Sequence, residues 1–111
     1  MDTSTRRSSS SMPNMTIEEI KELAHGWSIK EDILGKNVFN ENNDSIGIVE
    51  DLLVTRDTAI SYAVIGVGGF IGIGRHDVAI PVYQLRMNKS QITLPGATTE
   101  SLKALQPFEY Q

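Results

Sequence analysis

Short runs of branched aliphatic residues, each ended by a turn, occupy most of the chain after Trp27. The clearest run is Ile60–Val67, where successive side chains of a strand would point to opposite faces. Both faces are apolar, with Ile60, Tyr62 and Val64 on one and Ala63, Ile65 and Val67 on the other. A strand that is apolar on both faces is typical of the middle of a sheet, so we expect this run to be central.

Further strands are predicted at Val38–Phe39, Gly47–Thr55, Val78–Leu85 and Gln91–Leu94, separated by turn residues such as those of Asn40–Ser45. Pro81 cannot donate a hydrogen bond to a neighbouring strand, so it should lie at a sheet edge or a bulge. Five or six short strands with turns at this spacing predict an all-β fold, either a sandwich or a barrel. With so few strands, closure into a small barrel protects the edges better.

Short helices are expected at both ends of the β region. Residues 1–14 form a polar Ser- and Thr-rich tail that we expect to be disordered. Residues 15–26 predict a short amphipathic helix, which begins with a capping box at Thr16–Glu19 and carries Ile17, Ile20, Leu23 and Ala24 on one face. So short a helix must dock, either on the barrel or on another subunit. Residues 27–111 form the main domain, which ends in a second short helix capped by Thr98 or Thr99.

Composition narrows the classes of function. With 111 residues, 40% of them hydrophobic, the chain has room for one small domain. It has no cysteine, so disulfides, thiolate nucleophiles and Cys-based zinc sites are excluded. A net charge of −4 and scattered basic residues make nucleic-acid binding unfavourable. The polar N-terminus is unlike a signal peptide, and the uncharged segment Thr58–Gly74 has the glycines and β-branched residues of strands and turns rather than a membrane-spanning helix, so a cytoplasmic protein is expected.

Four ordered motifs, Gly35–Asn42, Ile46–Val54, Ser61–Gly74 and Asp77–Pro81, resemble the PRC-barrel domain. The ending Ile92–Thr98 resembles that of stand-alone bacterial members of the family. The resemblance implies a small SH3-like β-barrel that acts as an interaction module without shared catalytic residues. In this family, the domain forms the barrel of the photosynthetic reaction centre H subunit, and it also forms one domain of a ribosome small-subunit maturation factor.

The glycine-rich segment Gly66–Gly74 does not match a dinucleotide-binding loop, because the third glycine position falls on Ile71 and a strand follows instead of a helix. A glycine-rich hairpin or barrel corner is the better interpretation. Its large apolar residues Phe70, Ile71 and Ile73 are the candidate partner-binding site, because an exposed apolar tip marks an interface. The alternative is that these three side chains fold back onto the barrel.

Other polar residues have ordinary structural explanations. Asn40, Asn42, Asp44 and Asp51 loosely resemble a calcium loop, yet Ser45 stands where the loop needs glycine, so a polar turn is favoured. Glu50 and Asp51 should point to opposite faces of a strand unless a bulge intervenes, which argues against paired acid–base carboxylates with Asp57. The two histidines, His25 and His76, are expected at the surface, and Trp27 is expected to pack on the barrel flank.

The sequence therefore predicts a non-catalytic protein-interaction or assembly module, self-associating as a homodimer or larger homo-oligomer or binding another protein. No catalytic residue, metal site or cofactor is assigned, and an enzyme is not expected. A ribosome- or RNA-associated maturation factor is one alternative, although the acidic balance weighs against it. A small-ligand-binding barrel is the other alternative.

Overall fold

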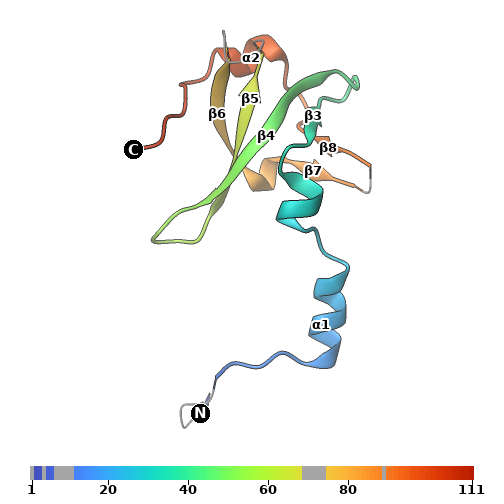
Figure 1. The fold of residues 1–111 in the computed structure, drawn as a ribbon, viewed down its shortest axis with the longest axis vertical. Coiled ribbons are helices and arrows are strands. Elements are labelled where there is room, and N and C mark those ends of the chain that lie inside the picture. The colour runs from blue at the N-terminus through green and yellow to red at the C-terminus, as the bar shows by residue number, and fades with distance from the viewer. Residues whose placement is uncertain (1, 4, 7–11, 69–74, 89) are drawn as a thin grey trace.

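A six-stranded sheet forms the body of the protein (Figure 1). The computed structural model describes residues 2–3, 5–6, 12–68, 75–88 and 90–111. The strands run in the order β6-β5-β4-β3-β8-β7, with the bounds β3 Asn37–Phe39, β4 Ser45–Val54, β5 Ser61–Val67, β6 His76–Pro81, β7 Arg86–Met87 and β8 Ile92–Thr93. Near the N-terminus, two two-residue strands, β1 Asp2–Thr3 and β2 Thr5–Arg6, pair in parallel. The expected disorder of residues 1–14 stays a prediction.

The central position predicted for Ile60–Val67 is confirmed, because β5 lies between β4 and β6 with antiparallel neighbours on both sides. Its inward residues join a single hydrophobic core that draws on almost every element, and Ile65, Val38, Val49, Val67 and Val78 are among its fully buried members. The core is built almost entirely from branched aliphatic side chains, which pack well on pleated strands. Short β-branched runs therefore produce the sheet, as expected.

The sheet is open, which corrects the expectation of a closed barrel. Its order begins at β6 and ends at β7, and no hydrogen-bonded ladder joins these two strands within the part of the chain that the structure describes. Pro81 is the last residue of the edge strand β6, as its missing N–H requires. The 3-10 turn η2 (Val82–Gln84) then carries the chain to β7 at the other edge, so the predicted strand Val78–Leu85 ends early.

Residues after the last helix protect the free edge of β6. The amide of Phe108 donates to the carbonyl oxygen of Asp77 at 2.8 Å. His76 Nε2 lies 2.9 Å from the carbonyl oxygen of Leu105. Because a carbonyl oxygen can only accept, Nε2 is the donor of this hydrogen bond. The C-terminal tail therefore occupies hydrogen-bonding positions that another strand would otherwise use, and Figure 1 shows it running outside β6.

Short helical segments flank the sheet. Helix α2 (Thr99–Lys103) begins at Thr98, whose hydroxyl accepts from the Ser101 amide, and its Leu102 enters the core. The π-helical turn η1 (Ile29–Ile33) is anchored by buried Ile33. Helix α1 (Ile17–Ala24) has no buried residue and stands away from the sheet (Figure 1). Of the two alternatives for α1, docking on its own sheet is not what the structure shows, because the connection through η1 directs the helix outward.

Candidate interaction surfaces

The partner surface predicted from the sequence, Phe70, Ile71 and Ile73, lies outside the described residues, since residues 69–74 are not among them. Its role in binding stays a prediction. The candidate sites within the described residues lie in α1, on the outer face of the sheet and beside Trp27.

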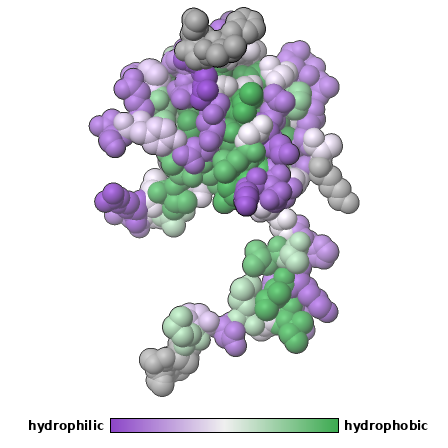
Figure 2. Space-filling view, viewed as in Figure 1, coloured by the Kyte–Doolittle hydropathy of each residue, from purple (hydrophilic) through white to green (hydrophobic). Residues whose placement is uncertain are grey.

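Helix α1 presents an uncovered apolar face. The predicted capping box is present: the Glu19 amide donates to Thr16 Oγ1 at 3.0 Å, and the Thr16 amide donates to Glu19 Oε1 at 2.7 Å. This box satisfies free amides at the helix start. The three-residue spacing then places Ile17, Ile20 and Leu23 on one side of the helix. These three side chains are 53% to 69% exposed. In Figure 2 the segment that stands away from the sheet shows a hydrophobic area beside a hydrophilic one.

An apolar pocket lies on the face of the sheet that points away from the core. Leu53 on β4 and Tyr62 on β5 are paired in register, and both alternate with core-facing neighbours. Together with four other residues they enclose about 350 Å³. We call this site the outer pocket, and its lining is Leu53, Val54, Thr55, Tyr62, Ala79 and Phe108. It contains no charged side chain, so it suits an apolar occupant.

The C-terminal tail lies against the outer face of the sheet and forms one wall of the outer pocket. The core takes the neighbours of Val64 in β5, so its side chain lies on the opposite, outer face of the sheet, yet Val64 is only 1% exposed. Its register partners are Asp51 and Ala79, and the tail is fixed to the same region by the hydroxyl of Tyr110, which donates to Asp51 Oδ2 at 2.6 Å. Phe108 and Tyr110 stack edge to face at 5.0 Å. We attribute the burial of Val64 to this tail, because these contacts hold its aromatic rings over the outer face.

A bulge in β4 brings two carboxylates to the outer face. The register of β4 on β5 shifts between Val49 and Asp51, so Glu50 is an extra residue that has no register partner on β5. Glu50 Oε1 lies 3.0 Å from Arg75 Nη2, and Arg75 Nε donates to Asp77 Oδ1 at 3.1 Å. From the sequence, Glu50 and Asp51 are expected on opposite faces unless a bulge intervenes, and the structure has this bulge. Both carboxylates are held by partners at an exposed surface, Glu50 by Arg75 and Asp51 by Tyr110.

Two pKa directions follow from these contacts. The hydrogen bond from Arg75 to Asp77, and the charges of Asp77 and Glu50, raise the pKa of Arg75 above its ordinary value. The hydrogen bond to Asp51 raises the pKa of Tyr110, because the phenol must keep its proton to donate it. Both groups therefore stay protonated at neutral pH and act as fixed structural donors.

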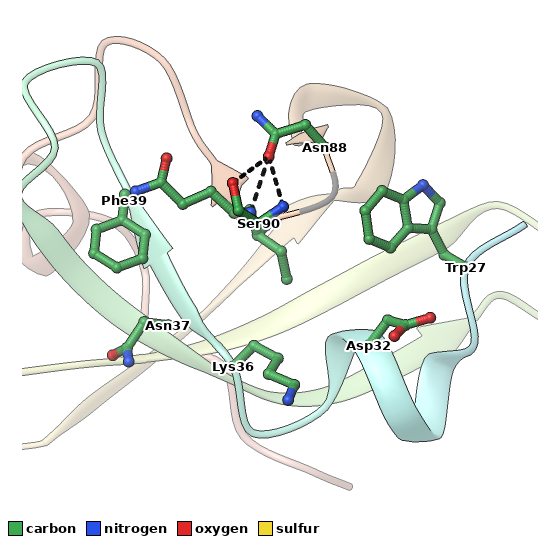
Figure 3. A pocket seen from close by; sticks show the side chains of 9 residues that line it. Trp27, Asp32, Lys36, Asn37, Phe39, Asn88 and Ser90 are labelled. Carbon is green, nitrogen blue, oxygen red and sulfur yellow. Dashed lines mark hydrogen bonds between the residues drawn. The ribbon is translucent and has the colours of Figure 1, made fainter.

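A second, more polar pocket lies beside Trp27 (Figure 3). It encloses about 380 Å³, and Trp27 and Phe39 stand on opposite sides of it. We call it the Trp pocket; the other lining residues are Asp32, Lys36, Asn37, Asn88, Ser90, Gln91 and Ile92. Asn88 Oδ1 accepts from the amides of Ser90 and Gln91 and from the Ser90 hydroxyl, so the oxygen of this amide is already engaged.

Trp27 is held there by the local structure of η1. The Ser28 hydroxyl accepts from the Glu31 amide, as a capping box requires, but the Ser28 amide donates to Asp32 rather than to Glu31. The wider π turn explains the shift by one residue, since Leu34 donates to the carbonyl of Ile29, five residues back. Trp27 is 40% exposed, so it borders a pocket instead of packing flat on the sheet.

The Asn40–Asp44 segment is a polar turn. Asn40 is buried, and its Oδ1 accepts from the amides of Asn42 and Asp44 while its Nδ2 donates to the carbonyl of Ala97. These bonds engage both polar atoms of the Asn40 side chain, as a polar turn requires. Across the residues for which the structure gives positions, no three His, Asp or Glu side chains come close enough to hold a metal ion.

Together these features define a small open β-sheet domain whose notable sites lie on its surface. The family model of the PRC-barrel domain matches residues 30–99, so the chain belongs to the PRC-barrel domain family. The resemblance seen in the sequence is therefore confirmed. No curated protein matches the chain. None of the helices in the described segments is both long and apolar enough to cross a bilayer.

Nothing in the sequence pointed to the outer pocket, the Arg75 ion pairs or the Tyr110–Asp51 bond. Each depends on the bulge at Glu50 or on the path of the C-terminal tail, and neither leaves a periodic signal. Trp27 was noticed, but Asn88 and Ser90, which line the same pocket, lie some sixty residues away in the chain.

Proposed function

We propose that this protein is a non-catalytic interaction module that assembles through the outside of its sheet and through α1, and that its partner is a second copy of itself. The observation that carries the proposal is the apolar face of α1, where no residue is buried. A two-turn helix is marginal in water on its own, so this face needs a partner to be stable. Membership of the PRC-barrel family supports a module of this kind.

The sheet acts in this role as an SH3-like open barrel with a filled interior, and its outer surface does the binding. Among the described residues the core is packed with aliphatic side chains, and the buried polar residue Asn40 has its side-chain atoms engaged in hydrogen bonds of the turn. A ribosome- or RNA-associated role has less support, since Arg75 is already paired with Glu50 and Asp77 and the polar side of α1 carries Glu18, Glu19 and Glu22. A cytoplasmic location stays a prediction.

The first experiment is to measure the solution mass of the wild type by light scattering over a range of concentrations. We expect a homo-oligomer. The variant Phe70→Asp, measured in parallel, tests the sequence-based surface separately, because its loss of assembly would implicate residues 70–73. A wild type that stays monomeric would contradict self-association, and one that also captures no other protein would contradict the interaction module itself.

Small-ligand binding in the Trp pocket is a second candidate, favoured by two aromatic rings that face each other across a volume within the range of ligand sites. Trp27 is the only tryptophan of the chain, so its fluorescence reports directly on this pocket. A screen of polar aromatic compounds should change that emission in a saturable way. The variant Phe39→Ala should abolish the change, and an unaltered response in this variant would rule out the pocket.

A further inference from the structure

We infer that α1 of one copy packs its apolar face into the outer pocket of a second copy, and that the exchange is reciprocal. The result is a closed two-fold dimer with two identical helix-to-pocket contacts. This inference rests on the proposed function and specifies its partner and its surface.

The two surfaces match in chemistry. The helix offers Ile17, Ile20 and Leu23 on one side, all exposed. The outer pocket is lined by apolar atoms, and its rim residue Val54 is 60% exposed. Each copy therefore carries one uncovered apolar ridge and one uncovered apolar hollow. Burying either surface against the other removes apolar area from water, which stabilises the complex by about 25 cal/mol for each Å² of apolar area.

The connection to the sheet favours a second copy over the same chain. Helix α1 ends at Ala24, and Trp27 already lies beside Asn88 and Ser90 in the Trp pocket, on the β8 side of the sheet. The intervening residues 25–26 and Trp27 span about 10 Å when fully extended. In the sheet order, three strand-to-strand steps separate β8 from β5, roughly 14 Å before curvature is counted. This short connection does not favour a contact within one chain, and in the structure α1 stays clear of its own outer pocket, since none of its residues is buried or lines that pocket.

Charge supports the same arrangement. The polar side of α1 carries three glutamates against one lysine. At the β4–β5 turn next to Val54 stands Arg56, which forms no ion pair with any residue that the structure describes. A helix in the pocket would bring its acidic side near Arg56 of the other copy. The same acidity disfavours an anionic membrane as the occupant, because interfacial helices carry basic polar faces.

Size explains why the exchange is reciprocal. An eight-residue helix is about 12 Å long, so one helix-to-pocket contact buries much less than the 1,200–2,000 Å² of a typical stable interface. A two-fold dimer forms two such contacts in one association step. A partner with only a single matching groove would bury half as much surface area.

Cysteine pairs test the contact directly, because the chain contains no native cysteine. Copies with Leu23→Cys and copies with Val54→Cys, carrying tags of different mass, are mixed and mildly oxidised. We expect a covalent heterodimer between the two variants. Tyr83→Cys is the matched control, since Tyr83 is 79% exposed and lies outside both surfaces; it should give little product with Leu23→Cys.

Charge variants provide the equilibrium test. Leu23→Asp and Val54→Asp each change an exposed residue, so circular dichroism should show an intact sheet in both. Each variant alone should be at least tenfold weaker in dimerisation than the wild type, while Tyr83→Asp should match it. Mixing the two should restore part of the dimer, because the intact helix of one variant meets the intact pocket of the other.

The outcomes separate this inference from the proposed function. A dimer that persists with Leu23→Asp would overturn the helix-to-pocket contact and leave a self-associating module that uses another surface. A double variant Leu23→Cys, Val54→Cys that crosslinks only within one chain would also overturn it, by placing the helix in its own pocket. A wild type that is monomeric at millimolar concentration would overturn the dimer and restrict the proposed function to a different protein partner.

Discussion

Two glycines in the middle of the sheet mark places where neighbouring atoms leave no room for a side chain. A Cβ at Gly47 would lie 2.6 Å from Ile65 Cγ2 and 2.8 Å from the carbonyl oxygen of Gly66. A Cβ at Gly66 would instead meet the ends of the Glu50, Arg75 and Asp77 side chains. The first contact involves backbone that cannot move freely, whereas the second involves exposed side chains that can.

We therefore predict that Gly47→Ala destabilises the protein by about 1–3 kcal/mol, as overpacking does. Gly66→Ala should cost less than about 1 kcal/mol, since it disturbs only surface ion pairs. Urea denaturation of the two variants and the wild type measures both values. Equal losses would show that the Arg75 cluster is as rigid as the backbone beside Gly47.

Tyr110 should report its bond to Asp51 at high pH. Because its pKa is raised in the folded protein, the bond contributes stability below pH 10, the ordinary value, and this contribution is lost as the pH rises through the folded pKa. An ultraviolet titration of the phenolate should show one tyrosine that ionises later than expected. Asp51→Asn should return that midpoint toward 10, and an unchanged titration would mean that the bond does not persist in solution.

At the scale of elements, the sequence predicted more than it missed. Alternation located β4, β5, β6 and β8 to within a few residues, because a strand with buried faces has a strong period of two. The capping residues Thr16 and Thr98 located both α-helices, since a helix start needs a side chain that accepts from its free amides. Local chemistry was sufficient in each of these cases.

Long-range features could not be predicted in the same way. Closure was expected because edges need protection, but the tail around Phe108 protects β6 instead. The outer pocket combines β4, β5 and β6 with that tail, and its formation depends on register rather than on composition. The predicted surface at Phe70, Ile71 and Ile73 falls outside the described residues, so it stays a prediction.

The tail should contribute to stability as a unit. Removing Phe108–Gln111 would expose Val64, free the edge of β6 and remove the Tyr110 donor from Asp51 Oδ2. We expect a loss of about 2–4 kcal/mol, from one aromatic and one aliphatic side chain returned to water. Thermal unfolding measures it, and Glu109→Ala is the control that should change little. A truncated chain as stable as the wild type would mean that the tail does not hold the outer face.

For the whole molecule, assembly and stability should be linked. If the folded chain is a dimer, its apparent stability rises with protein concentration, by up to about 1.4 kcal/mol for each tenfold increase. We predict a melting temperature that climbs with concentration in the wild type and stays constant in Leu23→Asp. Differential scanning calorimetry at three concentrations gives the comparison. A concentration-independent wild type would show that folding does not depend on association.

The bulge at Glu50 has one more consequence. Every other residue of β4 from Ile48 to Val54 finds its partner on β5 in unbroken succession once position 50 is set aside. The chain could therefore lose this one residue and keep each remaining side chain on the face it now occupies. Arg75 would be left with a single carboxylate, Asp77, so an insertion one residue long is what gives this arginine its second anchor.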